Sequence, residues 1–212
     1  MISVLLTDSP LLEAATVPGN LSELHREFAR CHRCSLADTR RRVLCASRFE
    51  RGGLMLIADR VTGYEEWEER VLAGETGALL DRILSAPGVN LAAEPVCVTA
   101  LVACRSRRGK LPGAAEIRAC GARLQALVTV IQPVIIVALG LCTGKALVRS
   151  GITQPAIDGR DYDVFRGIPV RTTCHPAEAL WGVPKEVTRI KRILYEDWKA
   201  ISAHYFALKT TR

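Results

Sequence analysis

Three short runs of consecutive apolar residues stand out along the chain. They cover residues 54–58, 95–102 and 134–140, and the second is rich in β-branched side chains. Such runs are shorter than a typical core helix, and unbroken apolarity indicates a strand that is buried on both faces. The pattern therefore predicts three buried strands, the second of which we expect to end at Cys104.

Segments with helical spacing of apolar positions separate these runs. Residues 61–70 are rich in acidic side chains and are expected to form a loop, and a short basic hairpin is expected over residues 160–173. Strands that alternate with helices predict an α/β fold with a mainly parallel sheet that is covered on both faces. The predicted helices cover residues 21–30, 77–84, 114–130 and the stretch through 145–148.

The length and composition suit one folded α/β domain over residues 1–212. Apolar residues make up 49% of the chain and charged residues 24%, which is ordinary for a globular protein. The amino terminus has no basic start, and no apolar run approaches the ~20 residues of a membrane-spanning helix. We therefore expect no membrane partner and a cytoplasmic location.

Basic side chains outnumber acidic ones and gather in clusters. Twenty-nine Lys and Arg against 22 Asp and Glu give a formal net charge of +7, with an isoelectric point near 9.2. This balance favours a polyanionic partner such as DNA, because clustered basic side chains suit phosphate contacts. A solvated basic surface is the alternative. The clusters fall within residues 40–51, 105–110 and 185–192.

Eight cysteines in a chain without a secretory signal indicate free or metal-bound thiols rather than disulfides. Cys31 and Cys34 form a CxxC pair, while Cys104 and Cys120 are dispersed further along. Four thiolates suit zinc or an iron-sulfur cluster, and one close pair with two distant ligands favours the cluster. The alternative is that Cys104 and Cys120 are small core residues, as Cys97 and Cys142 are expected to be. Nearby arginines, among them Arg118 and Arg123, argue against a core setting for the first two.

The order of motifs resembles the family 4 uracil-DNA glycosylases, the iron-sulfur branch of that superfamily. The motifs are CxxCxL, LMLIAD, GxxGxLLDRIL, a strand running into Cys-Arg, AEIxxC, IxPxIIVALG, RGIPV and HPA. The resemblance covers about residues 28–202 and leaves residues 1–20 as an amino-terminal extension. It implies a three-layer α/β/α fold with a central four-stranded, mainly parallel sheet. It also implies a structural 4Fe-4S cluster held by Cys31, Cys34, Cys104 and Cys120.

The segment that follows the first predicted strand departs from the family pattern. Where the family has GEAPG, with an acid that helps to position the attacking water, this chain has residues 58–62, ADRVT. The resemblance therefore implies that Asp59 orients the water, although Asp59 could also be a solvated loop carboxylate. The bulky Arg60 takes the place of a small residue, so we expect a differently shaped loop beside the base.

Two positions that recognise uracil in the family carry side chains of a different kind in this chain. The ungapped spacing puts Leu72 where the family has a stacking Phe, and the strand alignment puts Ala100 where it has an Asn that bonds the uracil edge. A flipped base is recognised by stacking and by hydrogen bonds to its pairing edge. We therefore expect a roomier base pocket, bordered by Arg60, Leu72 and Ala100, that does not select ordinary uracil.

The HPA motif keeps the family's second catalytic element. The resemblance implies that His175 donates a hydrogen bond to the oxygen of the departing base and stabilises its negative charge. Leu180 and Trp181 fall where the superfamily inserts a wedge into the base stack, and plain packing is the alternative for both.

These residues support three functional hypotheses. The favoured one is a monomeric, monofunctional DNA glycosylase that flips out and excises a modified pyrimidine, such as a hypermodified cytosine of a bacterial virus, in repair or antiviral defence. The second is a catalytically inactive iron-sulfur protein that binds DNA or senses lesions. The least favoured is ordinary uracil excision, with Arg60 or Tyr64 as substitute base contacts.

Overall fold

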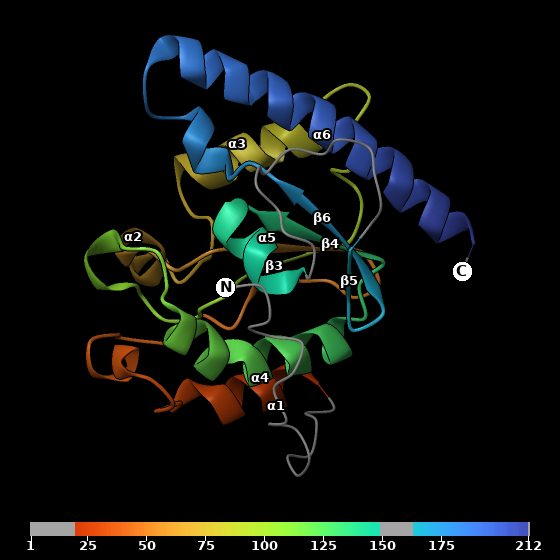
Figure 1. The fold of residues 1–212 in the computed structure, drawn as a ribbon. Helices are drawn as coiled ribbons and strands as arrows, with labels where there is room; N and C mark the ends of the chain where they lie inside the picture. The colour runs from red at the N-terminus through yellow and green to blue at the C-terminus, as the bar shows by residue number, and fades with distance from the viewer. Residues whose placement is uncertain (1–19, 149–162, 212) are drawn as a thin grey trace.

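The computed structural model describes residues 20–148 and 163–211, and it contains a six-stranded sheet in the order β1-β3-β2-β4-β6-β5 (Figure 1). The predicted amino-terminal extension and the first residues of the predicted hairpin lie outside the described residues. Helices cover both faces of the sheet, which confirms the α/β class. The strands are β1 Ser47–Phe49, β2 Leu54–Ala58, β3 Val96–Ala100, β4 Ile135–Leu139, β5 Asp163–Phe165 and β6 Ile168–Thr173.

The centre of the sheet is parallel, as predicted. Strands β3, β2, β4 and β6 pair in parallel, and the register runs Ala58 to Ala100 at the carboxyl ends of β2 and β3. Each edge adds a short antiparallel strand, β1 beside β3 and β5 beside β6. The prediction of four strands is therefore too small for the whole sheet. The four-strand count leaves out the two edge strands. Strand β5 nevertheless belongs to the hairpin expected over residues 160–173, because it pairs antiparallel with β6, whereas the three residues of β1 carry too little pattern to be found.

Successive residues of β2 point to opposite faces of the sheet and enter two separate cores. Met55 and Ile57 pack with α1 and α4, whereas Leu54 and Leu56 pack with α3 and α6. The helices lie accordingly on the two sides of the sheet in Figure 1. Their bounds are α1 Leu21–Ala29, α2 Gly63–Trp67, α3 Glu75–Leu84, α4 Ala114–Ile131, α5 Leu141–Leu147 and α6 Pro184–Thr210.

Two local predictions are wrong. Residues 61–70 are not a loop throughout, because α2 begins after Thr62 with a capping box in which Thr62 and Glu65 satisfy each other's backbone N–H groups. Strand β3 ends at Ala100 rather than at Cys104. The chain leaves the sheet there, and the carbonyl of Ala100 accepts a hydrogen bond from the buried side chain of Arg123.

No helix within residues 20–148 and 163–211 combines the length and apolarity that crossing a membrane requires.

Candidate active site and cysteine cavity

A pocket of about 750 Å³ opens at the carboxyl ends of the parallel strands. Ligands of open parallel sheets bind at this edge, where the chain leaves each strand. Asp59 follows β2, Gly140 follows β4 and His175 lies just beyond β6, so three strands deliver residues to one pocket. The other lining residues are Arg60, Thr62, Tyr64, Glu65, residues 73–76, Leu111, Leu141, Cys142, Ala177, Glu178 and Trp181.

Asp59 and Arg60 form an ion pair on the pocket wall. Arg60 Nη1 lies 3.0 Å from Asp59 Oδ2, and the two side chains are 26% and 15% exposed. Burial raises the pKa of the Asp59 carboxyl above its usual value, and the positive charge of Arg60 offsets part of that increase. A carboxylate with a raised pKa is a stronger base than a free one, which suits it to accept a proton from water.

His175 stands opposite this pair as a neutral imidazole of defined tautomer. The backbone N–H of Ala177 donates to its Nδ1 at 3.2 Å, so the ring proton resides on Nε2. Burial lowers the pKa of His175 to about 4, and the carboxylates of Glu65 and Glu178 only partly counter it. The backbone N–H of His175 donates to Glu178 Oε1 at 2.9 Å, which fixes the turn.

Gly140 allows the histidine to sit this close to the strand ends. Its φ of +88° lies in the left-handed region, and a Cβ atom there would come within 3.4 Å of the His175 Cβ. A larger residue would strain the backbone and crowd the imidazole.

The structure brings only some of the predicted site residues into the pocket. Asp59, Arg60, His175 and Trp181 line it, and Trp181 is 62% exposed. Leu72, Ala100 and Leu180 do not line it. Leu72 and Ala100 are buried in the core between the sheet and helices α3 and α6, and Leu180 is half-buried beside the pocket turn. A base in this pocket would therefore meet other side chains than the two aligned positions.

Glu65 is a pocket residue that the sequence analysis missed. Its carboxylate is buried and accepts two backbone hydrogen bonds of 2.7 Å, from Thr62 and from Leu72. Leu72 has a left-handed backbone with φ +54°, and this bond holds it there. The pattern Thr-x-x-Glu, which marks a capping box, was the available signal. Cys97 is fully buried, as expected of a core residue, whereas Cys142 is half-buried: it packs against the core and also lines the pocket.

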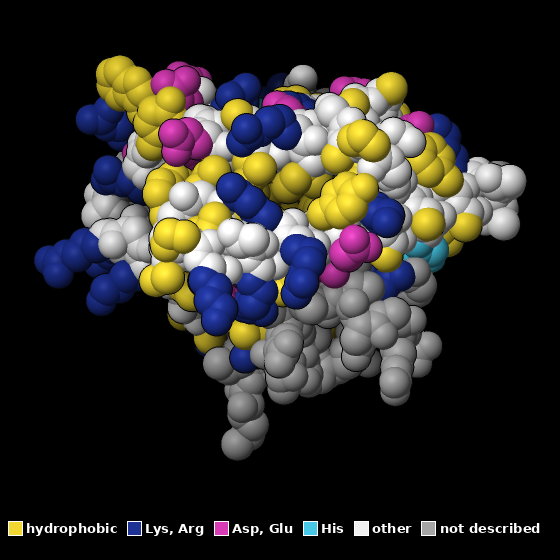
Figure 2. All heavy atoms as spheres, turned by 90° about the horizontal axis from the view of Figure 1, so that it is seen from above, with side chains coloured by type: hydrophobic (Ala, Val, Ile, Leu, Met, Phe, Trp, Pro, Cys, Tyr) yellow, Lys and Arg dark blue, Asp and Glu magenta, His cyan; other side chains and the backbone are white. Residues whose placement is uncertain are grey.

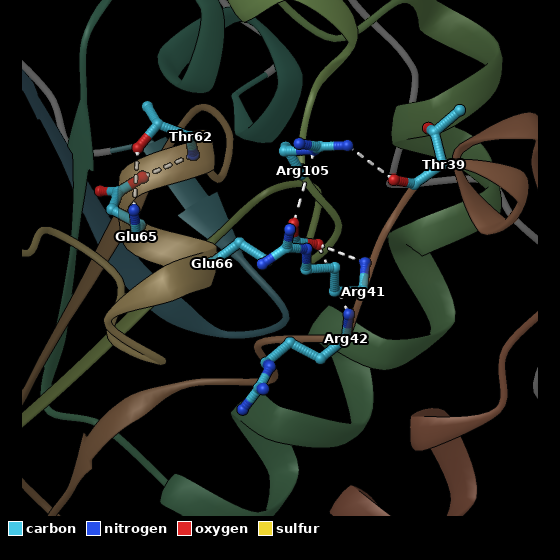
Figure 3. Close-up of polar contacts among 7 residues, drawn as sticks. All are labelled: Thr39, Arg41, Arg42, Thr62, Glu65, Glu66 and Arg105. Atoms are coloured by element: carbon cyan, nitrogen blue, oxygen red, sulfur yellow. Dashed lines mark hydrogen bonds and ion pairs between the residues drawn. The ribbon is translucent and has the colours of Figure 1, made fainter.

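The neighbouring Glu66 ties α2 to the segment that follows the CxxC pair (Figure 3). Its side chain is 2% exposed, and Oε1 accepts hydrogen bonds from the backbone N–H groups of Arg41 at 2.7 Å and Arg42 at 3.4 Å. Its Oε2 lies 3.4 Å from Nε of Arg105. Through Glu66, helix α2 is thus fixed to the basic clusters at residues 40–51 and 105–110.

Cys31, Cys34, Cys104 and Cys120 line one small cavity, on the side of the sheet that α1 and α4 cover. Within the described parts of the chain, no three His, Cys, Asp or Glu side chains converge tightly enough for a single metal ion. An iron-sulfur cluster takes one thiolate at each of four irons and so needs them spread around it. Four cysteine side chains at one cavity are the donor set that a 4Fe-4S cluster requires.

Burial, together with the nearby Cys120, Cys34 and Cys31, raises the pKa of the Cys104 thiol to about 12, although the positive charge of Arg40 lowers it in part. Cys104 is only 7% exposed and packs in the hydrophobic core, contrary to the setting that we expected from its arginine neighbours.

Arg123 is a buried cation that joins this cavity to the sheet. It is 1% exposed, and Nη1 donates to the carbonyl of Cys45 at 2.6 Å and to Thr99 Oγ1 at 3.0 Å. Nη2 donates to the carbonyl of Ala100, and Nε lies 3.4 Å from Cys120 Sγ. The guanidinium therefore places a positive charge beside the sulfur of Cys120.

Figure 2 views the side of the molecule that α3 and α6 form, and it shows several separate groups of Lys and Arg side chains with hydrophobic and acidic side chains among them. The cluster at residues 185–192 lies on α6, and its four basic side chains, Lys185, Arg189, Lys191 and Arg192, are exposed. This surface has the character that contact with a polyanion requires.

Comparison with known proteins places this chain in a family. The model of the uracil DNA glycosylase superfamily matches residues 60–199, and the chain belongs to that superfamily. It is similar to three proteins that each bear the name type-4 uracil-DNA glycosylase. The protein of Pyrobaculum aerophilum is 30% identical over 76% of this chain and 85% of its own. Those of Sulfurisphaera tokodaii and Saccharolobus solfataricus are each 28% identical over 86% of this chain and 83% and 85% of their own.

Proposed function

We propose that this protein is a monofunctional DNA glycosylase: it flips one nucleotide out of DNA and hydrolyses its N-glycosidic bond, leaving an abasic site. The observation that carries the proposal is the pairing of Asp59 with the Nε2–H tautomer of His175 in one strand-end pocket. The names of the relatives, which are all uracil-DNA glycosylases, support the same reaction type.

In the proposed reaction the bond between C1′ and the base nitrogen breaks, and its electron pair leaves with the base. His175 Nε2–H donates to a base oxygen and stabilises the negative charge that develops there. Because burial keeps the pKa of His175 near 4, the ring is a neutral donor at neutral pH. Water adds to C1′, and Asp59 orients it and accepts its proton through the carboxylate oxygen that Arg60 does not engage.

The substrate we propose is a modified pyrimidine larger than uracil. The family's stacking and edge-reading positions correspond to Leu72 and Ala100, and both side chains are buried outside the pocket. Arg60, Tyr64 and Trp181 are then the side chains available to contact the base. Hypermodified cytosines of bacterial viruses fit a pocket of about 750 Å³, which is near the upper end of the usual range of ~300–1,000 Å³. The proposal thus extends to antiviral defence.

We further propose that Cys31, Cys34, Cys104 and Cys120 hold a 4Fe-4S cluster. When bound, the cluster would supply four iron–sulfur bonds as a structural cross-link. It would join the segment after α1, the segment after β3 and helix α4, which lie far apart in the sequence. We also propose that the protein acts on DNA as a monomer, because one copy of the chain supplies every residue of the pocket.

Trp181 is the proposed wedge. It is 62% exposed at the pocket rim, and a large apolar side chain there could fill the space that a flipped nucleotide leaves in the base stack. The half-buried Leu180 next to it would support the turn rather than enter DNA.

A substrate panel tests the proposed function. Purified protein is incubated with duplexes that carry uracil, hypoxanthine, 5-hydroxymethylcytosine or glucosylated hydroxymethylcytosine, and alkali-labile abasic sites are counted. We expect abasic sites with a modified cytosine and few with uracil. Efficient release of uracil alone would make the protein an ordinary uracil-DNA glycosylase. DNA binding without abasic sites on any substrate would favour the inactive DNA-binding hypothesis.

A further inference from the structure

A second concave site lies beside the base pocket. It is a groove of about 530 Å³ lined by Thr39, Gly63 and residues 105–109. Three arginines, Arg105, Arg107 and Arg108, belong to its lining, and no acidic residue does. We refer to it as the arginine groove. Its composition suits an anion rather than a neutral ligand.

Arg105 is held in place before any ligand arrives. Its Nη2 donates to the carbonyl of Thr39 at 2.8 Å, and its Nε lies 3.4 Å from the buried carboxylate of Glu66 (Figure 3). The side chain is still 40% exposed. A guanidinium has five N–H donors, so the Nη1 donors are left to bind an oxyanion. An arginine fixed in this way loses little side-chain entropy on binding.

Ser106 adds an unused hydrogen-bonding group to the same groove. The residue is 7% exposed, and its Oγ has no hydrogen-bond partner among the described residues. Its backbone N–H donates to the carbonyl of Val61 at 3.0 Å, which positions the residue. A buried hydroxyl without a partner is unfavourable, so this group points to a ligand that accepts its hydrogen bond.

The same two segments of the chain separate the arginine groove from the base pocket. Gly63 lines the groove, whereas its neighbours Thr62 and Tyr64 line the pocket. On the other side, residues 105–109 line the groove and Leu111 lines the pocket. The two sites are therefore adjacent, with neighbouring residues of the same two segments on either side.

From these observations we infer that the arginine groove binds a backbone phosphate of the DNA strand that carries the flipped nucleotide. Arg105 and Ser106 donate hydrogen bonds to its oxygens, while Arg107 and Arg108 supply further positive charge. The inference rests on the proposed function and deepens it, because it assigns the contact that holds the target strand in register with Asp59. Phosphate contacts of this kind position DNA without selecting its sequence.

The test measures binding and requires no catalysis. The probe is a fluorescent duplex with one tetrahydrofuran abasic analogue, and its affinity for the full chain is followed by anisotropy over a range of salt concentrations. We compare the wild type with Arg107→Gln and Ser106→Ala, and use Arg166→Gln, at the exposed turn between β5 and β6, as the matched control. Arg107→Gln should weaken binding about 5–10-fold and lower the salt slope by about 1. Ser106→Ala should weaken binding without lowering thermal stability, because it removes an unpaired hydroxyl.

A second arm replaces single phosphates near the analogue with neutral methylphosphonates. We expect one linkage whose replacement weakens wild-type binding several-fold but has no further effect in Ser106→Ala or Arg107→Gln. Equal salt slopes and equal linkage profiles in all proteins would overturn the inference. So would tight binding of inorganic phosphate that depends on Ser106 while the linkage profile stays flat. If the phosphate contact is found but no base is excised, the proposed function fails and this inference stands.

Discussion

The backbone N–H of Ala177 donates a hydrogen bond to Nδ1 of His175 over 3.2 Å, so the imidazole presents Nε2–H to the pocket. This bond lies within the short turn that follows β6, and Glu178 accepts the backbone N–H of His175 to complete it. One local turn thus sets both the tautomer and the position of the side chain that we propose stabilises the departing base.

The lowered pKa of His175 predicts a stability change with pH. The unfolded chain binds a proton at this residue near pH 6.5, whereas the folded chain does so only near pH 4. The free energy of unfolding should therefore fall as the pH drops from 7 towards 4, by up to about 3 kcal/mol from this residue. Thermal midpoints at pH 7 and pH 5 should differ more for the wild type than for His175→Gln. Identical pH dependence in the two proteins would contradict the buried, neutral state.

The raised pKa of Asp59 predicts a trade-off between stability and activity. Because the folded state disfavours the charged carboxyl, Asp59→Asn should unfold at a higher temperature than the wild type at pH 7. The same change should slow base excision at least ~100-fold, since the amide cannot accept a proton from water. Asp81→Asn is the matched control: Asp81 is an exposed residue that pairs with Arg48. It should change thermal stability little and leave excision intact, and a destabilised Asp59→Asn would count against the account.

The cysteine cavity predicts which thiols hold iron. Replacement of Cys31, Cys34, Cys104 or Cys120 by Ser should each lower the iron content and the brown absorbance of protein purified without oxygen. Cys142→Ser, in the base pocket, should keep the full iron content. If Cys142→Ser and Cys120→Ser lose iron equally, the assignment of the four ligands is wrong.

Replacing the buried Arg123 of helix α4 should lower the free energy of unfolding substantially. Arg123→Met leaves the carbonyls of Cys45 and Ala100 without their donor, and we expect a loss of about 1–3 kcal/mol for each carbonyl. Arg123→Lys should also destabilise the protein, because an ammonium cannot reproduce the planar set of hydrogen bonds. Arg118→Met, an exposed change on the same helix, provides the comparison in thermal unfolding. Equal midpoints for Arg118→Met and Arg123→Met would show that the network contributes little.

The central fold follows from local sequence pattern. Strands β2 and β4 are unbroken apolar runs, and Gly77 to Leu84 has clear helical spacing within α3, so these elements could be predicted. The edge strand β5 belongs to the predicted hairpin, but the other edge strand, β1, could not be predicted. Strand β1 has three residues with an irregular register, and its pairing with β3 depends on tertiary contacts.

The candidate site could be predicted only in part. Asp59 and His175 could be predicted, because each belongs to a motif in the ordered set that the chain shares with the family. Arg123 could not be predicted as buried, because a charged side chain in a helix enters a core only when distant acceptors such as the Ala100 carbonyl meet it. The burial of Leu72 outside the pocket depends in the same way on the left-handed turn that Glu65 holds.

The central claim is that Asp59 and His175 act on one flipped base in this pocket. The most direct test measures free base released in single-turnover reactions, by mass spectrometry, on the best substrate of the panel. The account predicts that His175→Ala and Asp59→Asn each lower the rate at least ~100-fold, with DNA affinity nearly unchanged, and that Arg166→Gln equals the wild type. Base release by His175→Ala at the wild-type rate would contradict it.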